Sequence, residues 1–423
     1  MWIKGARILD PENGIDTMGD IHVSHGRIAG IYPGGSPDTD AESIDAQGKW
    51  VLPGLIDMHV HLRDPGFEYK EDIASGSLAA AAGGVTTMVC MANTDPVNDN
   101  PSVTKYIIDR AKSVALVRIM PVGAVSKALM GQELSEMGLM KEAGIVAVSD
   151  DGNPVEDASL MRSALFYAST FGLPLLSHCQ DRPLSVSGVM NEGALSSGLG
   201  LSGIPGVSEE IMVSRDLLLS RDTRVPIHLT HLSTKTSLEL VSRAKEQGIP
   251  VTCDVTPHHL LLTEEGVKTY DTNMKMYPPL RTEEDRKALV EGLLHGIIDC
   301  VATDHAPHAR DEKNLDFDLA PFGVIGLQTL LPALLKIHFE NDKGLLGVLG
   351  AVTCNPARIL GIDGGNLTPG SRADITIIDP QRQWVFTEEC IRSKSKNSPF
   401  LGQRFTGMVI QTIVEGQTVF RES

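Results

Sequence analysis

The feature that most restricts the fold of this chain is an alternation of short apolar runs with longer helical patterns between residues 55 and 305. Eight runs have the length and composition of buried strands, and stretches such as "SLELVSRAKEQG" separate them. They span residues 55–61, 84–91, 115–122, 144–149, 173–178, 225–232, 250–257 and 298–305. The alternation predicts an α/β fold, a (β/α)8 TIM-like barrel over residues 54–361. Periodicity alone leaves a doubly wound sheet open.

Both ends of the chain have a different, β-rich pattern. "MWIKGARILD" and "DIHVSHGRIAGI" lie near the start, "RADITIID" and "MVIQTIVEGQTVF" near the end, and turn residues interrupt them. We therefore expect residues 1–53 and 362–423 to form one small β-sandwich domain, with the barrel inserted between them. A chain of 423 residues is long enough for one large and one smaller domain.

Charge and cysteine content restrict the partners. The formal net charge is −17, which argues against a nucleic-acid or anionic membrane partner because phosphates would be repelled. The N-terminus lacks the apolar core of a secretion signal, and no window approaches the roughly 18 uninterrupted apolar residues of a membrane span. The six cysteines are dispersed without a C-x-x-C pair, as in reduced proteins. We expect a cytoplasmic protein.

Polar side chains recur where the apolar runs end. His59 and His61 are two residues apart at the end of the first run, so they share a strand face. Asn93 lies just past the second run. Further candidates close the fourth, fifth, sixth and eighth runs, namely Asp150 and Asp151, His178, His231 and Asp304. In a barrel all these ends meet at one face.

This set has the composition of a metal site. Imidazole and carboxylate suit zinc and similar divalent ions, and a pair of ions usually shares a bridging carboxylate. A lone histidine at a strand end is more often structural, but the repetition at matching strand ends favours a metal site. His258 and His259 end the seventh run. Their position is compatible both with packing in the core and with supporting the metal ligands.

In these motifs the sequence resembles the dihydroorotases of the amidohydrolase superfamily, the type with an unmodified aspartate between two metals. The resemblance covers nearly the whole chain. Its motifs are "DMHVHLRDPG" (57–66), "MANTDP" (91–96), "SDDGNPV" (149–155), "SHCQD" (177–181), "LTHLST" (229–234), "ATDHAPH" (302–308), "APFGVIGLQT" (320–329) and "LTPGSRADITIID" (367–379).

The resemblance implies two Zn²⁺ ions per subunit. The implied ligands are His59, His61, Asp151, His178, His231 and Asp304. Asp151 would bridge the ions. Asp304 would touch the first ion and would also be the catalytic proton shuttle.

The resemblance also implies the residues that hold the substrate. These are His61, Arg63, Asn93, His308, Phe322 and Gly323. A planar guanidinium grips a carboxylate through two parallel hydrogen bonds, which suits Arg63; the alternative is a surface ion pair with Asp64 or Glu68. Relatives usually carry asparagine in the segment that reads "KMYPPLR" here, so Tyr277 either substitutes through its hydroxyl or loses that contact.

The implied activity is the reversible cyclisation of N-carbamoyl-L-aspartate to L-dihydroorotate in pyrimidine (UMP) synthesis. Another cyclic amidohydrolase, such as an allantoinase or hydantoinase, is one alternative. A non-catalytic partner subunit of aspartate transcarbamoylase is the other. Implied partners are a second copy in a homodimer and aspartate transcarbamoylase. The charged segment 310–318 is read either as a lid or as a solvated loop.

Overall fold

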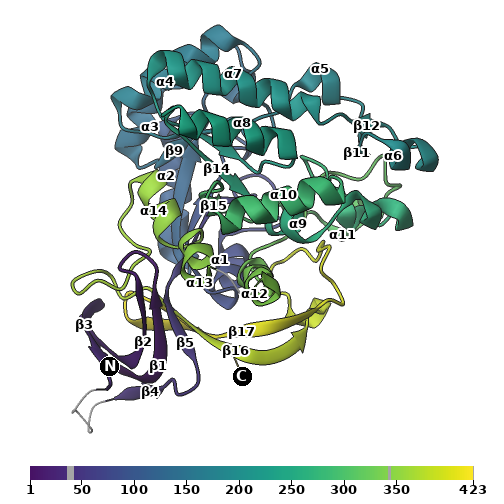
Figure 1. Ribbon diagram of the computed structural model, residues 1–423. Helices are drawn as coiled ribbons and strands as arrows, with labels where there is room; N and C mark the ends of the chain where they lie inside the picture. Colours follow the sequence, from purple (N-terminus) through teal and green to yellow (C-terminus); the bar gives the residue numbers. More distant parts are fainter. Residues whose placement is uncertain (36–41, 342–343, 423) are drawn as a thin grey trace.

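The structure is a computed structural model that describes residues 1–35, 42–341 and 344–422. Its larger part is an eight-stranded parallel sheet with the strand order β15-β14-β13-β10-β9-β8-β7-β6. In Figure 1 this part lies above the strands labelled β1 to β5, β16 and β17. The strands are β6 (Leu55–Val60), β7 (Val85–Cys90), β8 (Arg118–Gly123), β9 (Ala147–Val148), β10 (Leu175–His178), β13 (Ile227–Thr230), β14 (Val251–Val255) and β15 (Cys300–Val301). The sheet follows chain order, as the predicted barrel requires.

A contact beyond the end of β15 brings the two edges of this sheet together. Val60 and His305 form a parallel bridge, and the backbone N–H of His61 donates to the carbonyl of His305 at 2.8 Å. The ring is therefore nearly closed, which excludes the doubly wound alternative and confirms the predicted barrel.

The predicted runs correspond to these strands, but several strands end before the polar residues that we singled out. The eighth run was predicted to extend to residue 305, whereas β15 ends at Val301. The fourth strand is only β9, and Asp151 lies three residues beyond it. These side chains therefore sit on the loops that follow the strands, where the backbone can turn to aim them inward.

Helices surround the barrel. The longer ones are α1 (Ile73–Ala82), α2 (Pro101–Val114), α3 (Met137–Ala143), α4 (Ala158–Thr170), α7 (Val207–Thr223), α8 (Lys235–Glu246), α10 (Glu283–Leu294) and α12 (Leu330–Asn341). Local sequence sets several of their starts: Asp72 caps α1 by accepting from Ser75 N–H at 2.8 Å, and Asn100 caps α2 just before a proline at its first position. The strands β6 and β7 are buried along their whole length because helices cover the barrel.

Shorter elements lie in the connections. The helices are α5 (Arg182–Ser185), α6 (Ala194–Leu199), α9 (Pro257–Leu261), α11 (Arg310–Lys313), α13 (Leu345–Gly350) and α14 (Cys354–Leu360). The 3₁₀ turns are η1 (Lys127–Leu129), η2 (Glu264–Thr269), η3 (Thr272–Met274) and η4 (Glu388–Cys390). A small parallel pair joins β11 (Met190–Asn191) to β12 (Gly203–Ile204).

The two chain ends share a second eight-stranded sheet. Its strands are β1 (Trp2–Asp10), β2 (Ile15–Ser24), β3 (Arg27–Pro33), β4 (Ser43–Asp45), β5 (Trp50–Pro53), β16 (Ile375–Val385), β17 (Arg404–Val414) and β18 (Gln417–Arg421). The order is β18-β17-β16-β5-β1-β2-β3, with β4 paired to β1. The expected β domain built from both chain ends is therefore present. Hydrogen bonds join its strands into one continuous sheet.

This sheet has its own apolar core and also packs on the barrel. Ile3, Ile21, Val51, Ile375 and Ile413 belong to one buried cluster drawn from both chain ends. In addition, α12 contacts β17, and α1 contacts β17 and β18. The predicted boundary near residue 54 falls between β5 and β6, and it stays a prediction.

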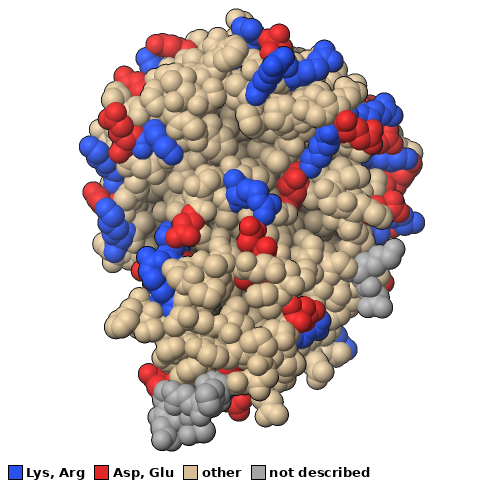
Figure 2. Space-filling view, turned by 60° about the vertical axis from the view of Figure 1, so that its left-hand side comes forward, with Lys and Arg blue, Asp and Glu red and all other residues tan. Residues whose placement is uncertain are grey.

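The described surface carries charges of both signs. On the face drawn in Figure 2, basic and acidic side chains are interspersed among uncharged residues. Among the described residues, no helix combines the length and the hydropathy that a membrane span needs.

Candidate metal centre

Asp151 lies between two pairs of histidines, and each of its carboxylate oxygens faces one pair. Its Oδ2 lies 3.4 Å from Nε2 of His59 and 3.4 Å from Nε2 of His61. Its Oδ1 lies 3.1 Å from Nδ1 of His178 and 3.3 Å from Nε2 of His231. Asp151 forms a group of three with each histidine pair, and within each group the potential ligand atoms lie within 4.8 Å of one another. This is the arrangement that a carboxylate bridging two ions requires.

Asp304 completes the set from the side of the first pair. Its Oδ1 lies 2.9 Å from Nε2 of His61 and 3.6 Å from Nε2 of His59. The structure therefore brings all six sequence-predicted ligands together at the C-terminal face of the barrel.

The donor set fits cations. Nε2 of His59, which faces Asp151, is buried without a hydrogen-bond partner, and buried polar atoms of this kind rarely stay unpaired. Burial alone would raise the pKa of Asp151, but the imidazoles of His59, His178 and His231 outweigh it and hold that pKa well below its usual range. The site thus offers ionised carboxylate and imidazole, the ligands that zinc-like ions prefer.

Three residues at the site have a left-handed backbone. The φ angles are +60° at Arg63, +38° at His231 and +47° at Asp304. Such angles are strained for residues other than glycine and persist only where the surroundings hold them.

Buried aspartates supply part of that support. Asp57 accepts hydrogen bonds from the backbone N–H of His59 at 3.2 Å and of Thr303 at 3.1 Å, so it ties the first strand to the loop that follows the eighth. Asp254 accepts from the N–H of His231 at 2.7 Å. Sequence reasoning missed both residues, although Asp57 carries a signal: it precedes His59 by two positions and so shares its strand face.

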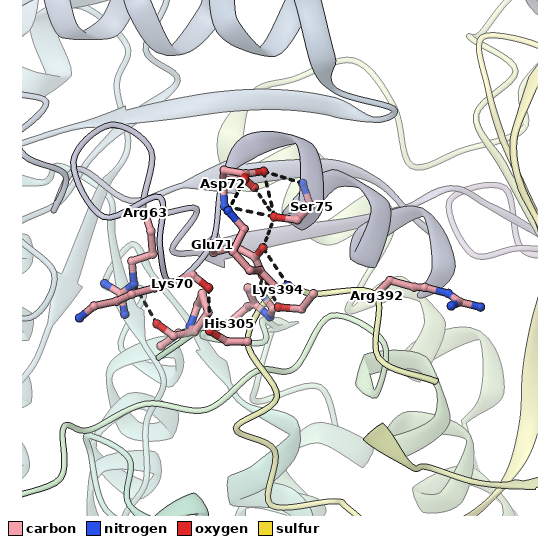
Figure 3. A network of polar contacts seen from close by, with 12 residues as sticks. Arg63, Lys70, Glu71, Asp72, Ser75, His305, Arg392 and Lys394 are labelled. Atoms are coloured by element: carbon pink, nitrogen blue, oxygen red, sulfur yellow. Dashed lines mark hydrogen bonds and ion pairs between the residues drawn. The ribbon is translucent and has the colours of Figure 1, made fainter. Parts of the chain in front are cut away.

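A second network of polar contacts surrounds the fully buried Glu71 (Figure 3). Its carboxylate lies 3.4 Å from Nε2 of His305, the residue after Asp304. The hydroxyls of Ser75 and Ser393 and the backbone N–H of Lys394 donate to the same carboxylate. Sequence reasoning missed Glu71, because Ser393 is 322 residues away along the chain.

The candidate metal centre opens into a cavity of about 460 Å³. Every sequence-predicted substrate residue lines it, namely His61, Arg63, Asn93, His308, Phe322 and Gly323, together with Tyr277. Asp151, His178 and Asp304 also line it. The cavity therefore joins the candidate ligands to the candidate substrate contacts.

Arg63 does not form the surface ion pair that was the alternative. Asp64 accepts from Tyr106 at 3.1 Å, and Glu68 accepts from the N–H of Gly66 at 3.0 Å. The Nε of Arg63 donates to the carbonyl of Pro307 at 3.3 Å, while burial lowers its pKa. The side chain thus lines the cavity and is anchored on neighbouring backbone.

Neighbouring residues set both the orientation and the protonation state of the His308 ring. Its Nε2–H donates to the carbonyl of Phe322 at 2.8 Å. Burial, together with the nearby charges of Arg63, Lys70 and Lys313, lowers the pKa of His308 to about 2, so the ring is neutral at pH 7. The neutral ring carries its only proton on Nε2, so Nδ1 can donate to a carboxylate only when the ring is protonated. A substrate carboxylate that binds at Nδ1 must therefore stabilise the protonated ring.

Tyr277 forms a wall of the cavity beside the second histidine pair. Its ring stacks on that of His178 with the centroids 5.2 Å apart, and its hydroxyl lies 2.8 Å from the hydroxyl of Ser185. The phenol is therefore already engaged with a neighbour on α5. Farther out, Arg310–Lys313 of the predicted lid is a short helix, and the ammonium of Lys313 donates to the carbonyls of Pro321 and Gly323.

A barrel with a paired histidine–aspartate centre at the C-terminal ends of its strands defines the amidohydrolase class of hydrolases. Residues 48–237 match the family model described as "Dihydro-orotase-like". Over 421 residues the chain is 50% identical to a dihydroorotase of Geotalea daltonii and 51% identical to one of Geobacter metallireducens, covering 100% of this chain and 99% of each relative. The chain belongs to the dihydroorotase family, as the motifs predicted.

Solved structures support the same architecture. An L-hydantoinase (dihydropyrimidinase) of Arthrobacter aurescens superimposes with a TM-score of 0.89 at 26% identity, covering 100% of this chain and 96% of that one. A D-hydantoinase superimposes with a TM-score of 0.85 at 23% identity, which concerns the fold alone.

Proposed function

We propose that this chain catalyses the reversible cyclisation of N-carbamoyl-L-aspartate to L-dihydroorotate in the synthesis of UMP. The observation that carries the proposal is the position of Asp151 between two histidine pairs, at the base of a cavity that Arg63 also lines. Full-length identity to curated dihydroorotases supports the choice of substrate.

The proposal includes two zinc ions. His59 and His61 would hold one, His178 and His231 the other, and Asp151 both; Asp304 would touch the first. When bound, the ions would polarise the ring amide carbonyl and lower the pKa of water towards 7.

Asp304 is the proposed proton carrier of this chain. Burial would raise its pKa, but the neighbouring imidazoles, with His61 the nearest, hold the pKa well below its usual range. It therefore stays ionised at neutral pH and accepts a proton from the attacking water. In the hydrolytic direction it then delivers that proton to the leaving ring nitrogen, which is general base and then general acid catalysis.

The substrate carboxylate is proposed to bind at Arg63, which lines the same cavity as the candidate ligands. The planar guanidinium of Arg63 grips a carboxylate with two parallel hydrogen bonds, and its burial strengthens the pairing. Asn93 and His308 flank it, and backbone groups of Phe322 and Gly323 would contact the ring.

A hydantoinase is the second candidate, favoured by the structural similarity to the Arthrobacter enzyme. The two functions differ in the substrate carboxylate, which a hydantoin or allantoin ring lacks. Turnover of L-dihydroorotate, hydantoin and allantoin by purified protein, with metal content measured in the same preparation, separates them.

We expect two metal ions per chain and a clear preference for L-dihydroorotate. Preferred turnover of hydantoin or allantoin contradicts the proposed substrate. Metal-loaded protein without any turnover supports the non-catalytic role beside aspartate transcarbamoylase.

We further propose a homodimer in the cytoplasm, able to associate with aspartate transcarbamoylase. Exposed apolar side chains on α4 and α7, among them Phe166, Ile211 and Leu218, support a protein interface there. All six cysteines are free thiols, as a reducing compartment favours. Light scattering of the purified chain, alone and mixed with aspartate transcarbamoylase, tests both assemblies.

A further inference from the structure

The segment that joins η4 to β17, in the C-terminal part of the chain, lies against the barrel. Between η4 and β17, the side chains of Ser393, Ser395, Asn397 and Ser398 are all buried. Ser395 donates to the carbonyl of Lys70 at 2.6 Å, so this segment lies against the loop that follows β6. None of these residues lines the cavity described above.

Both the nitrogen and the oxygen of the Asn397 side-chain amide form hydrogen bonds with backbone groups, in two segments that line the cavity. Its Nδ2 donates to the carbonyl of Ala306 at 3.1 Å and to that of Gly323 at 3.1 Å. Its Oδ1 accepts from the N–H of His308 at 3.1 Å. The side chain is only 4% exposed, so no water can readily replace these contacts.

The backbone that Asn397 holds also anchors the proposed carboxylate site. Arg63 donates to the carbonyl of Pro307, which lies between Ala306 and His308. The ring of His308 donates to the carbonyl of Phe322, next to Gly323. Arg63, and His308 when it is protonated, therefore both depend on these two segments. The segments are held together by the Asn397 amide and by the backbone hydrogen bond from the N–H of Ala306 to the carbonyl of Val324 at 2.8 Å.

Close packing leaves little room for a substitute. A Cβ on Gly323 would lie 2.7 Å from the Cβ of Ala306, so the two segments are already in contact. Loss of the amide leaves the buried carbonyl of Ala306 unpaired and the carbonyl of Gly323 with only the ammonium of Lys313 as its donor. The carbonyl of Ala306 can regain a partner only if the segments move.

We propose that Asn397 is a positioning residue for the substrate carboxylate, acting through residues 306–308 and 322–323. This inference rests on the proposed function. It assigns to the C-terminal part of the chain a role in substrate recognition, while the metal centre depends on other supports such as Asp57 and Asp254.

The test is steady-state kinetics on Asn397→Asp and Asn397→Ala with L-dihydroorotate. The aspartate keeps the acceptor for the N–H of His308 but loses both donors. We expect KM to rise roughly ten- to a hundredfold, with kcat within about threefold of the wild type and with unchanged metal content.

The matched control is Asn355→Asp. Asn355 Nδ2 donates to the carbonyl of Asp299 at 2.8 Å, at the opposite end of the barrel, so its loss should lower stability without changing KM. Asn397→Ser serves as a milder variant if the first two do not fold.

An unchanged KM in folded variants, a fall in kcat alone, loss of metal, or failure of all three variants to fold contradicts the positioning role. A wild-type chain that does not turn over dihydroorotate contradicts the proposed function instead, and this inference falls with it.

Discussion

His61 donates a hydrogen bond from Nδ1 to the side-chain oxygen of Asn93 at 2.9 Å, which leaves the lone pair on Nε2. That Nε2 lies 3.4 Å from Asp151 and 2.9 Å from Asp304. Asn93 thus selects the tautomer of a candidate ligand, in addition to the substrate contact proposed for it.

Replacing Asn93 by alanine removes the group that orients His61. We expect metal affinity to fall roughly ten- to a hundredfold, as is usual when the hydrogen-bond partner of a ligand is lost. Competition with a chelator, followed by metal analysis, measures the change. Asn366→Ala in the second sheet's region is the control, and equal metal affinity in the two variants contradicts the orienting role.

Asp304→Asn removes the proposed proton carrier but keeps its shape. We expect a folded protein whose kcat falls by about two to four orders of magnitude, because the amide cannot accept the proton. The same kinetics on Asp318→Asn, outside the set of candidate ligands, is the control. Near-normal turnover by Asp304→Asn excludes this residue from the proton path.

Arg63→Lys keeps the charge but loses the planar fork. We expect kcat/KM for L-dihydroorotate to fall at least about tenfold, mainly through KM. The matched control is Arg110→Lys, where the arginine lies 3.7 Å from Asp64 on the outside of the cavity. If kcat/KM is intact in Arg63→Lys, the carboxylate binds elsewhere.

Tyr277 contributes its ring more than its hydroxyl. Tyr277→Phe keeps the stack on His178 and loses only the contact with Ser185, so we expect kcat/KM within about threefold of the wild type. Tyr277→Ala opens the wall, and we expect a larger rise in KM. A large loss of activity in the phenylalanine variant would show that the hydroxyl itself contacts the substrate.

Glu71 makes stability depend on pH. Burial would raise its pKa, but His305 and the serine hydroxyls outweigh it, so the folded-state pKa lies below the ordinary value near 4.5. The stabilising contribution is therefore present above pH 4.5 and is lost as the pH falls through the folded-state pKa.

Glu71→Gln tests this dependence. We expect the variant to be less stable at pH 7 by about 1–3 kcal/mol, and the difference from the wild type to shrink towards pH 4. Thermal unfolding at several pH values measures it, with the exposed Glu142→Gln as control. A difference that does not change with pH shows that packing, and not ionisation, causes the loss.

Local pattern predicted much of this molecule. The barrel follows from apolar runs whose length and spacing are properties of neighbouring residues, and the candidate ligands follow from polar residues at the ends of those runs. The β-rich composition of both chain ends likewise predicted a shared domain. Strand ends were placed too late at Asp304, because the turn that aims this side chain has no strong local signal.

Periodicity, read from the sequence, predicted an α/β fold, and polar residues at the ends of the apolar runs gave the candidate ligands. The family motifs then singled out the six, Asp151 among them. Only the tertiary structure decided that the two oxygens of Asp151 face different histidine pairs, and that Glu71 and Asn397 hold the site from behind. Hydrogen bonds such as that of Glu71 to Ser393 join residues 322 positions apart. Partners at such a separation leave no trace in a local pattern, because they are set by how the whole chain packs.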